Sequence, residues 1–251
     1  MRLAKFLYKT NIHWGVVNDD NTINFLSRDP FKKILITKKN IPIRACKLLA
    51  PATASKIILV GLNYLDHARE LKMAIPKEPL IFLKPSTSLI GPGEKIIYPP
   101  GVKRLDYEAE LAFVVRKKAK DIFSKDYQKY ILGYTCLNDV TARDIQTKDT
   151  QWTRAKSFDT FCPAGPWLET EFNPNKAKIK LYLNGNLRQN SSTKNFIFSV
   201  AKVFSFISKI MTLLPGDIIS TGTPPGVGFM KKSDKVTVAI DGIGNLTNYI
   251  R

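Results

Sequence analysis

Two glutamates separated by one apolar residue, Glu108 and Glu110, stand in an otherwise largely hydrophobic segment, residues 105–115. The β-branched and aromatic residues of this segment are typical of a strand. Positions i and i+2 of a strand share one face, so both carboxylates should project together, away from Ala109 and Leu111. Two negative charges held this close repel each other unless a positive charge lies between them. A divalent cation, which favours carboxylate oxygens, would satisfy them; the alternative is a solvated strand face.

The size and composition of the chain are those of a globular protein. Its 251 residues are enough for one large domain, or one large and one small. No apolar run is long enough to span a bilayer, and the N-terminus lacks an apolar signal-peptide core. The cysteines, Cys46, Cys136 and Cys162, are odd in number and scattered, which argues against a disulfide scaffold or a cysteine-based zinc site. We therefore expect a cytoplasmic protein with no membrane association.

The net charge of +18, from 39 Lys and Arg against 21 Asp and Glu, is the unusual global property. It is compatible with a basic nucleic-acid-binding module, or with a field that attracts small anionic substrates. The basic residues are spread along the chain, and their densest cluster, residues 32–47, has few aromatic residues to stack on bases. No helix-turn-helix, zinc-finger or ribonucleoprotein motif is visible. A lysine-rich composition is the simpler interpretation, and nucleic-acid binding remains only a remote alternative.

Strand patterns dominate the chain. Residues 1–50 alternate short apolar runs with turn residues, which predicts a small β-rich N-terminal region, and residues 51–251 form the second region. Helical spacing is clear only at 199–213, with short helices expected at 63–72, 124–130 and 141–147. The pattern predicts a fold that is mainly β with a few helices (α+β). We expect further strands at 56–60, 80–84, 95–98, 107–115, 130–137, 178–184, 217–221 and 235–240.

His67 and Glu70 are spaced i, i+3, which places them on one face of a helix. A carboxylate beside an imidazole fixes its tautomer and raises its basicity, as in a general-base dyad. A surface His–Glu pair is the alternative. The dyad gains weight because the only other histidine, His13, has no acidic neighbour in the sequence nearby.

Four more residues are candidates for binding or catalysis. Asp139 follows a predicted strand and could supply a third oxygen ligand beside the two glutamates. Arg143 and Gln146, again spaced i, i+3, could face an anionic ligand together. Lys156 could hold a developing negative charge near a metal site. For Arg143 and Lys156, ordinary surface charge is the alternative.

A Gly/Pro-rich loop, residues 221–228, follows another predicted strand. Its backbone amides and the Thr223 hydroxyl could bind a carboxylate. The loop lacks the Gly-Lys-Ser/Thr ending of a phosphate-binding P-loop, and as a lone feature it is only a tight turn.

Taken together, these segments resemble the fumarylacetoacetate hydrolase family, in the branch of the acylpyruvate hydrolases and 2-hydroxyhepta-2,4-diene-1,7-dioate isomerases. The matching motifs occur in family order and cover residues 57–251. They are Gly61-Leu62-Asn63-Tyr64-x-x-His67-x-x-Glu70, Phe82-Leu83-Lys84-Pro85, Asp106-Tyr107-Glu108-Ala109-Glu110-Leu111, Asn138-Asp139-Val140-Thr141-Ala142-Arg143-Asp144, Ala155-Lys156-Ser157-Phe158-Asp159, Leu183-Asn184-Gly185 and Pro215-Gly216-Asp217-Ile218-Ile219-Ser220-Thr221-Gly222-Thr223-Pro224.

The resemblance implies a mixed β-sandwich roll over residues 51–251 that assembles as a homodimer. It implies Mg²⁺ (or Mn²⁺) held by Glu108, Glu110 and Asp139, and a catalytic dyad on a mobile lid. Two departures, Ala164 in place of a larger aliphatic residue and a short segment at 229–233, affect the expected pocket shape. By the same resemblance the dyad is His67 and Glu70, and the substrate contacts are Arg143, Gln146, Lys156 and Thr223, with Lys156 also catalytic.

These features predict an enzyme that cleaves a carbon–carbon bond in acylpyruvate-type 2-oxo acids by metal-assisted hydrolysis. The alternatives are 2-hydroxyhepta-2,4-diene-1,7-dioate isomerisation and oxaloacetate decarboxylation, which use a similar enolate and need no activated water. The expected substrate is a small anionic 2-oxo acid.

Overall fold

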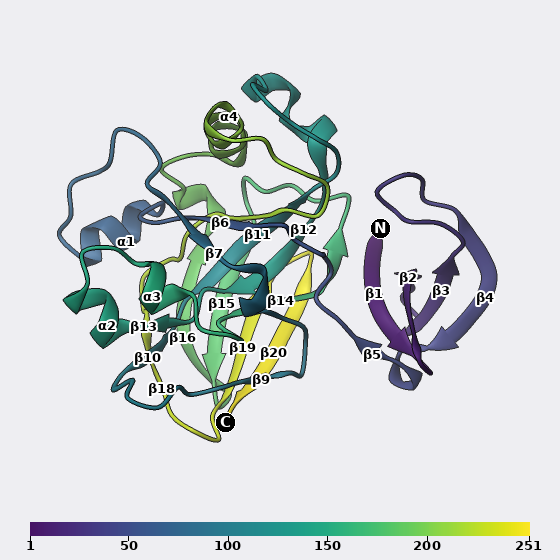
Figure 1. The fold of residues 1–251 in the computed structure, drawn as a ribbon, viewed down its shortest axis with the longest axis horizontal. Coiled ribbons are helices and arrows are strands. Elements are labelled where there is room, and N and C mark those ends of the chain that lie inside the picture. The colour runs from purple at the N-terminus through teal and green to yellow at the C-terminus, as the bar shows by residue number, and fades with distance from the viewer.

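Twelve strands form the largest sheet of the computed structural model, which describes residues 1–251 (Figure 1). Ten of them follow one path, and two short strands pair at its side, β5 (Lys47–Leu48) with β1 and β8 (Leu89–Ile90) with β14. The order along the path is β4 (Ile36–Pro42), β3 (Thr22–Leu26), β2 (Asn11–Val17), β1 (Arg2–Tyr8), β14 (Cys162–Glu169), β12 (Ile131–Asn138), β11 (Ala109–Val115), β17 (Ile218–Ser220), β6 (Ile57–Val60) and β7 (Ile81–Lys84).

Two smaller sheets and a few short helices complete the fold. The five-stranded sheet has the order β16 (Asn186–Ser192), β15 (Lys178–Leu183), β19 (Lys235–Ile240), β20 (Gly244–Ile250) and β9 (Lys95–Ile96), and the three-stranded sheet β13 (Thr141–Ala142), β10 (Leu105–Tyr107) and β18 (Gly228–Met230). The helices are α1 (Leu65–Glu70), α2 (Arg143–Lys148), α3 (Thr153–Lys156) and α4 (Val200–Ile210), with 3₁₀ turns at Ile43–Ala45, Ser86–Ser88, Ser124–Tyr130 and Thr193–Asn195. The predicted class, mainly β with few helices, is confirmed. No helix is long and apolar enough to pass through a lipid bilayer.

Strand β11 is buried along its whole length because it has a core on each face. Leu111 and Phe113 belong to the largest hydrophobic core, which also takes residues from the five-stranded sheet and from α4. Ala112 and Val114, which point the other way, pack into a second core with Leu59 of β6. A strand covered on both faces usually has a continuous hydrophobic sequence. A charged residue within such a strand is buried and therefore needs a specific partner.

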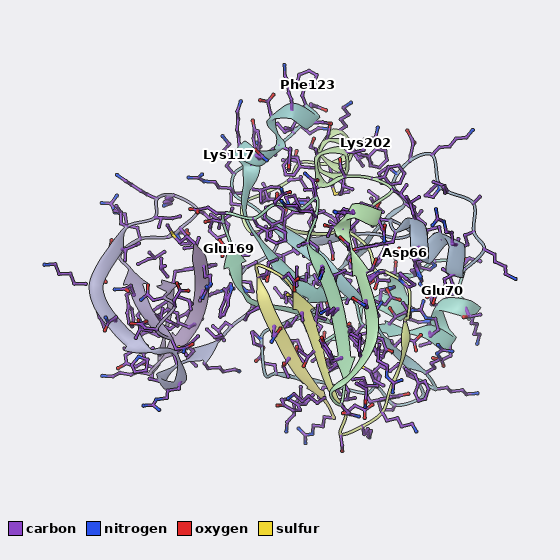
Figure 2. All side chains as sticks on the ribbon, turned by 180° about the vertical axis from the view of Figure 1, so that it is seen from behind. Asp66, Glu70, Lys117, Phe123, Glu169 and Lys202 are labelled. Carbon is purple, nitrogen blue, oxygen red and sulfur yellow. The ribbon has the colours of Figure 1, made fainter.

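The N-terminal strands β1 to β5 enclose a core of their own and form the lobe that carries the N-terminus in Figure 1. Phe6 and Phe25 pack edge to face there, with ring centroids 5.2 Å apart. The lobe joins the rest of the protein where β1 pairs with β14, Leu3 opposite Leu168 and Arg2 opposite Glu169; Figure 2 labels Glu169 at this junction. The boundary between regions 1–50 and 51–251 stays a prediction.

The strand expected at 107–115 is interrupted at Glu108, which corrects the sequence prediction. The chain leaves the three-stranded sheet at the end of β10 and enters the twelve-stranded sheet at the start of β11. At this crossing the backbone N–H of Glu108 donates to Asn138 Oδ1 (2.9 Å), and that of Ala109 donates to Gln189 Oε1 (2.9 Å). Side-chain amides therefore replace the ladder partners that a continuous strand would have.

Strand β14 has no counterpart among the predicted strands. Its residues Pro163, Gly165 and Pro166 are turn formers, and prolines are rare in central strands because they cannot donate to the ladder. The structure accommodates them because the pairing of β14 with β12 shifts register between Tyr134 and Cys136. Tertiary pairing on both sides of β14 thus overrides the local signal.

Replacing Asn138 by Ala should destabilise the protein, because the buried Glu108 N–H loses its acceptor. A buried donor left without a partner costs about 1–3 kcal/mol in the free energy of unfolding, measurable by urea denaturation. Asn40→Ala is the matched control, since Asn40 is exposed in β4 and should change stability by less than about 0.5 kcal/mol. Equal stabilities for the two variants would contradict this account of the crossing.

Candidate functional site

Three carboxylates meet at the crossing between the sheets. Glu108 lies between β10 and β11, Glu110 lies in β11, and Asp139 directly follows β12. Ala109 is paired with Asn138 in the β11–β12 ladder, and the Asp139 N–H donates to the Glu108 carbonyl (2.9 Å), so the three residues are neighbours across two strands. One oxygen from each lies within 4.8 Å of the others, and all three residues are buried. The solvated-face alternative is therefore wrong.

Three cations surround these carboxylates. Lys156 Nζ lies 2.8 Å from Glu108 Oε2 and 2.5 Å from Asp139 Oδ2, and the Arg143 guanidinium donates to Glu108 Oε1. Lys84 Nζ lies 2.6 Å from Asp139 Oδ1. Lys156 is 2% exposed, so its interpretation as ordinary surface charge is wrong. Three cations thus lie beside two of the three carboxylates, Glu108 and Asp139, in the protein interior.

Lys84 is a buried contributor whose role sequence reasoning missed. Its ammonium donates to the carbonyls of Val140 (3.0 Å) and Phe161 (2.5 Å), which lie on two different segments of the site. It also forms an ion pair with Asp139 Oδ1 at 2.6 Å. The motif that contains Lys84 was visible in the sequence, but nothing in it indicated that the side chain points inward.

The two glutamates have opposite electrostatic environments. Burial disfavours the charged form of Glu108, but Lys156 and Arg143 outweigh it and lower the pKa of Glu108 to about 2. Burial and the nearby Asp139 carboxylate raise the pKa of Glu110 well above its usual range, although Ser220 Oγ donates to it at 2.5 Å. Glu110 is therefore the carboxylate that lacks positive charge beside it.

The residues present fit a hard divalent cation. The donor set consists of carboxylate oxygens only, the preference of Mg²⁺ and Mn²⁺ rather than of softer metals. Glu110 forms no ion pair with any of the three cations, and its pKa is raised. A divalent ion among the three oxygens would supply the positive charge that Glu110 lacks, while the assignment of these residues as its ligands stays a prediction.

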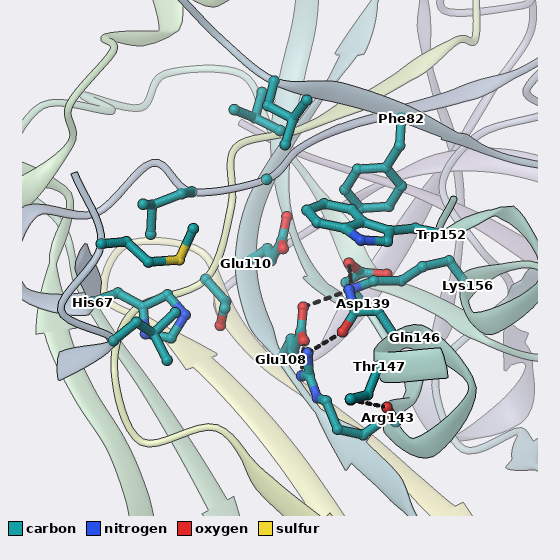
Figure 3. Close-up of a pocket in the computed structure, with 17 residues that line it drawn as sticks. His67, Phe82, Glu108, Glu110, Asp139, Arg143, Gln146, Thr147, Trp152 and Lys156 are labelled. Carbon is teal, nitrogen blue, oxygen red and sulfur yellow. Dashed lines mark hydrogen bonds and ion pairs between the residues drawn. The ribbon is translucent and has the colours of Figure 1, made fainter. Parts of the chain in front are cut away.

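A cavity of 320 Å³ opens beside the carboxylates, a size typical of small-molecule sites (Figure 3). It brings together every predicted site residue except Glu70. In Figure 3, His67 lies on one side, Lys156 and Trp152 on the other, and Glu108 and Glu110 between them. The predicted residues in its wall are His67, Glu108, Glu110, Asp139, Arg143, Gln146, Lys156 and Thr223.

The His67–Glu70 pair forms as the spacing predicts. Both residues lie on α1, and His67 Nδ1 is 2.8 Å from Glu70 Oε2. Glu70 stands behind the imidazole, outside the cavity wall, and its Oε1 accepts the N–H of Gly226 at 3.1 Å. Because Nδ1 is hydrogen-bonded to the Glu70 carboxylate, Nε2 is the nitrogen that is free to accept or donate a proton in a reaction.

Arg143 and Gln146 lie together on α2, and the guanidinium donates to Gln146 Oε1. Arg143 Nε also donates to Asp106 Oδ2 (2.8 Å), a buried carboxylate of β10 itself. Thr223 is held by Gln189, whose Nε2 donates to the hydroxyl at 2.9 Å. Gln189 thus anchors both the start of β11 and the Thr223 loop. Sequence reasoning missed it, because a lone glutamine in a hairpin carries no signal.

Apart from Thr147, the rest of the cavity wall is apolar, and this too was missed. It includes Leu71 and Met73 just after α1, Leu80, Phe82 and Trp152. Isolated apolar residues in loops give no sequence signal for a binding site, because these residues come together only in the folded chain.

The comparisons with known proteins agree with this geometry. Residues 56–251 match the family model described as fumarylacetoacetate (FAA) hydrolase C-terminal, and residues 1–51 match the model described as Rv2993c-like, N-terminal. Oxaloacetate tautomerase Fahd2a of Rattus norvegicus is 43% identical over 222 residues, which are 84% of this chain and 71% of the relative.

Two solved structures are similar to this protein in fold as well as in sequence. A 5-carboxymethyl-2-hydroxymuconate delta-isomerase from Mycobacterium smegmatis superimposes with a TM-score of 0.94 at 40% identity, covering 100% of this chain and 99% of the other. A maleylpyruvate hydrolase from Sphingobium sp. SYK-6, solved with manganese(II) and pyruvate, gives a TM-score of 0.83 at 28% identity, covering 100% and 98%. The chain belongs to the fumarylacetoacetate hydrolase family.

Proposed function

We propose that this chain hydrolyses a carbon–carbon bond in acylpyruvate-type 2-oxo acids with Mg²⁺ or Mn²⁺ as its cofactor. The observation that carries the proposal is the charge balance of the buried cluster. The cluster contains three carboxylates, Glu108, Glu110 and Asp139, and three cations, Lys84, Lys156 and Arg143. With all three carboxylates ionised, a bound divalent cation would leave this cluster with two excess positive charges. An enolate of a 2-oxo acid carries two negative charges, one on its carboxylate and one on its enolate oxygen, so it matches that excess.

The bound cation would supply Lewis-acid stabilisation of negative charge on the substrate oxygens. The chain's own groups supply the rest. Arg143 and Gln146 line the cavity and would bind the substrate's polar end, and Thr223 would offer a further hydroxyl in the wall. The Lys156 ammonium, held in the interior, can stabilise the developing enolate oxygen without reorganisation of solvent.

The His67–Glu70 pair supports hydrolysis as the proposed reaction. Glu70 fixes the imidazole through Nδ1, so Nε2 can take a proton from a water molecule in the cavity. The hydroxide adds to the carbonyl carbon farther from the carboxylate. The bond between that carbon and the methylene then breaks, leaving a carboxylic acid and the enolate of pyruvate. Return of the proton from the imidazolium to the methylene carbon completes the balance.

Keto–enol tautomerisation of oxaloacetate is the second candidate, because the rat relative is named an oxaloacetate tautomerase. It moves one proton between the methylene carbon and the keto oxygen and consumes no water. The same cluster would stabilise its enolate, so the two reactions differ in whether His67 activates water. A screen of acylpyruvates, maleylpyruvate-type diacids and oxaloacetate, with Mg²⁺ and with chelator, separates them.

The proposed partners are limited to the small anionic substrate and a second copy of the chain. Assembly as a homodimer stays a prediction, which sedimentation velocity would test. The remote nucleic-acid alternative would require duplex binding that weakens steeply with salt.

His67→Ala should remove water activation while leaving the metal cluster intact. Loss of a general base lowers the rate by about 10²–10⁴-fold, so acylpyruvate hydrolysis should fall by that factor in steady-state assays. Oxaloacetate tautomerisation or decarboxylation should fall less, because neither needs an attacking water. Glu70→Gln should reproduce the loss more weakly, since the imidazole keeps a neighbour but loses its charged partner.

The other histidine provides the control. His13 packs against Phe25 in the N-terminal lobe, with ring centroids 5.0 Å apart, so His13→Ala should retain full hydrolysis. Metal affinity should be unchanged in both histidine variants. Hydrolysis that survives His67→Ala at the wild-type rate would refute the dyad and favour the tautomerase.

Binding of Mn²⁺ or Mg²⁺ should strengthen as the pH rises. Because the pKa of Glu110 is raised, this carboxyl keeps its proton to higher pH than an ordinary glutamate, and a cation that binds must displace that proton. Calorimetric titrations in buffers of different ionisation enthalpy should show proton release, and the apparent affinity should fall on acidification. Glu110→Gln should bind the cation weakly and release no proton. Binding that is independent of pH would contradict the assignment.

A further inference from the structure

The cavity beside the carboxylates is divided into a charged half and an apolar half. The charged half holds the three carboxylates with Arg143 and Lys156. The apolar half is formed by Leu71, Met73, Leu80 and Trp152, which come from the segment after α1, the start of β7 and the start of α3. A substrate with its 2-oxo acid group in the charged half therefore extends the remainder of its chain toward apolar side chains.

One side of the apolar half is rigid. The ring of Trp152 packs edge to face on Phe82, with centroids 5.3 Å apart and planes at 78°. Its other neighbour is Gly61, where an added Cβ would lie only 3.2 Å from the ring. Lys156 Nζ lies 5.1 Å from the centroid of Phe82, so this aromatic pair also borders the charged half. Trp152 is thus a fixed wall where the two halves meet.

The other three apolar side chains of this half are open to solvent. Leu71, Met73 and Leu80 are 50%, 55% and 53% exposed, although each lines the cavity. Large exposed apolar side chains gathered at one opening are a feature of ligand-binding surfaces. An apolar ligand segment among them would remove this surface from water, at a gain of about 25 cal/mol per Å².

No uncommitted cation faces the apolar half. The basic residues in the cavity wall are His67, Arg143 and Lys156. His67 pairs with Glu70, Arg143 with Asp106 and Glu108, and Lys156 with Glu108 and Asp139. The next cation along the chain, Lys72, lies between two wall residues but is not part of the wall. A carboxylate at the far end of a substrate would therefore lose water without gaining a partner, which is unfavourable.

We infer that Leu71, Met73, Leu80 and Trp152 form a subsite for an apolar substrate tail, so the enzyme selects 2-oxo monoacids over long dicarboxylates. This inference rests on the proposed function and names its substrate class. The inference concerns the part of the substrate beyond its fourth carbon. In oxaloacetate the second carboxylate is the fourth carbon, so this carboxylate would still lie in the charged half.

A binding experiment with unreactive ligands tests the subsite. Calorimetry in the presence of Mg²⁺ would compare pyruvate, 2-oxopentanoate, 2-oxohexanoate and 2-oxoadipate. Affinity should rise by about fourfold for each methylene beyond the fourth carbon. The six-carbon pair is matched in length, and 2-oxoadipate, with its terminal carboxylate, should bind at least about tenfold more weakly than 2-oxohexanoate.

A new cation in the apolar half should reverse this preference. In Met73→Lys the ratio of 2-oxoadipate to 2-oxohexanoate affinity should rise by at least about tenfold. Ile75→Lys is the matched control, because Ile75 lies in the same segment, is 59% exposed and does not line the cavity. It adds the same long-range charge, so its ratio should change by less than about twofold. Lys72→Ala should leave the ratio unchanged.

The outcomes separate the subsite from the function. If 2-oxoadipate binds as well as 2-oxohexanoate, the subsite is refuted while the proposed function stands. The same conclusion follows if the wild-type protein prefers 2-oxoadipate and Lys72→Ala abolishes that preference. Equal effects of Met73→Lys and Ile75→Lys would also refute it. If no 2-oxo acid binds, pyruvate included, the proposed function fails and the subsite fails with it.

Discussion

The burial of three carboxylates within a few ångströms of one another is the constraint on which the rest of the site depends. Removing a charge from water costs several kcal/mol, and neighbouring like charges add to that cost. The protein offsets it with buried cations, Lys84 and Lys156, and with the half-buried Arg143. Glu110 is left without such a partner. An incompletely compensated cluster of hard oxygens in a closed interior is the arrangement that a divalent cation stabilises.

The sheets are arranged so that this cluster can exist. The chain crosses from the three-stranded to the twelve-stranded sheet at Glu108, which frees that residue from a regular ladder. Asn138 and Gln189 accept the two backbone N–H groups that the crossing leaves free, and Asn138 directly precedes Asp139. One interruption therefore places carboxylates from two strands at the same point. The cores on both faces of β11 hold that point rigid.

The site also joins two kinds of recognition in one cavity. Under the proposed function, its charged half would bind the end that all 2-oxo acids share, and its apolar half would contact the part in which such acids differ. Relatives named as tautomerase, isomerase and hydrolase share this family's scaffold. In this chain the charged cluster and the apolar wall are separate groups of residues, so one scaffold can serve reactions that share an enolate and differ in the tail or in the use of water.

The sequence alone determined the fold class and most of the charged site. Period-two patterns predict the strands, and the i, i+3 spacing of His67 with Glu70 depends only on local helix geometry, whereas the proximity of Glu108 and Glu110 also depends on the crossing between the sheets. Tertiary structure decided what local patterns cannot contain. It made the Pro-rich β14 a central strand, broke the expected strand at Glu108, turned Lys84 inward, and brought Leu71, Leu80 and Trp152 to one wall. These outcomes depend on contacts between residues far apart in the chain, and the free energy of those contacts outweighs local preference.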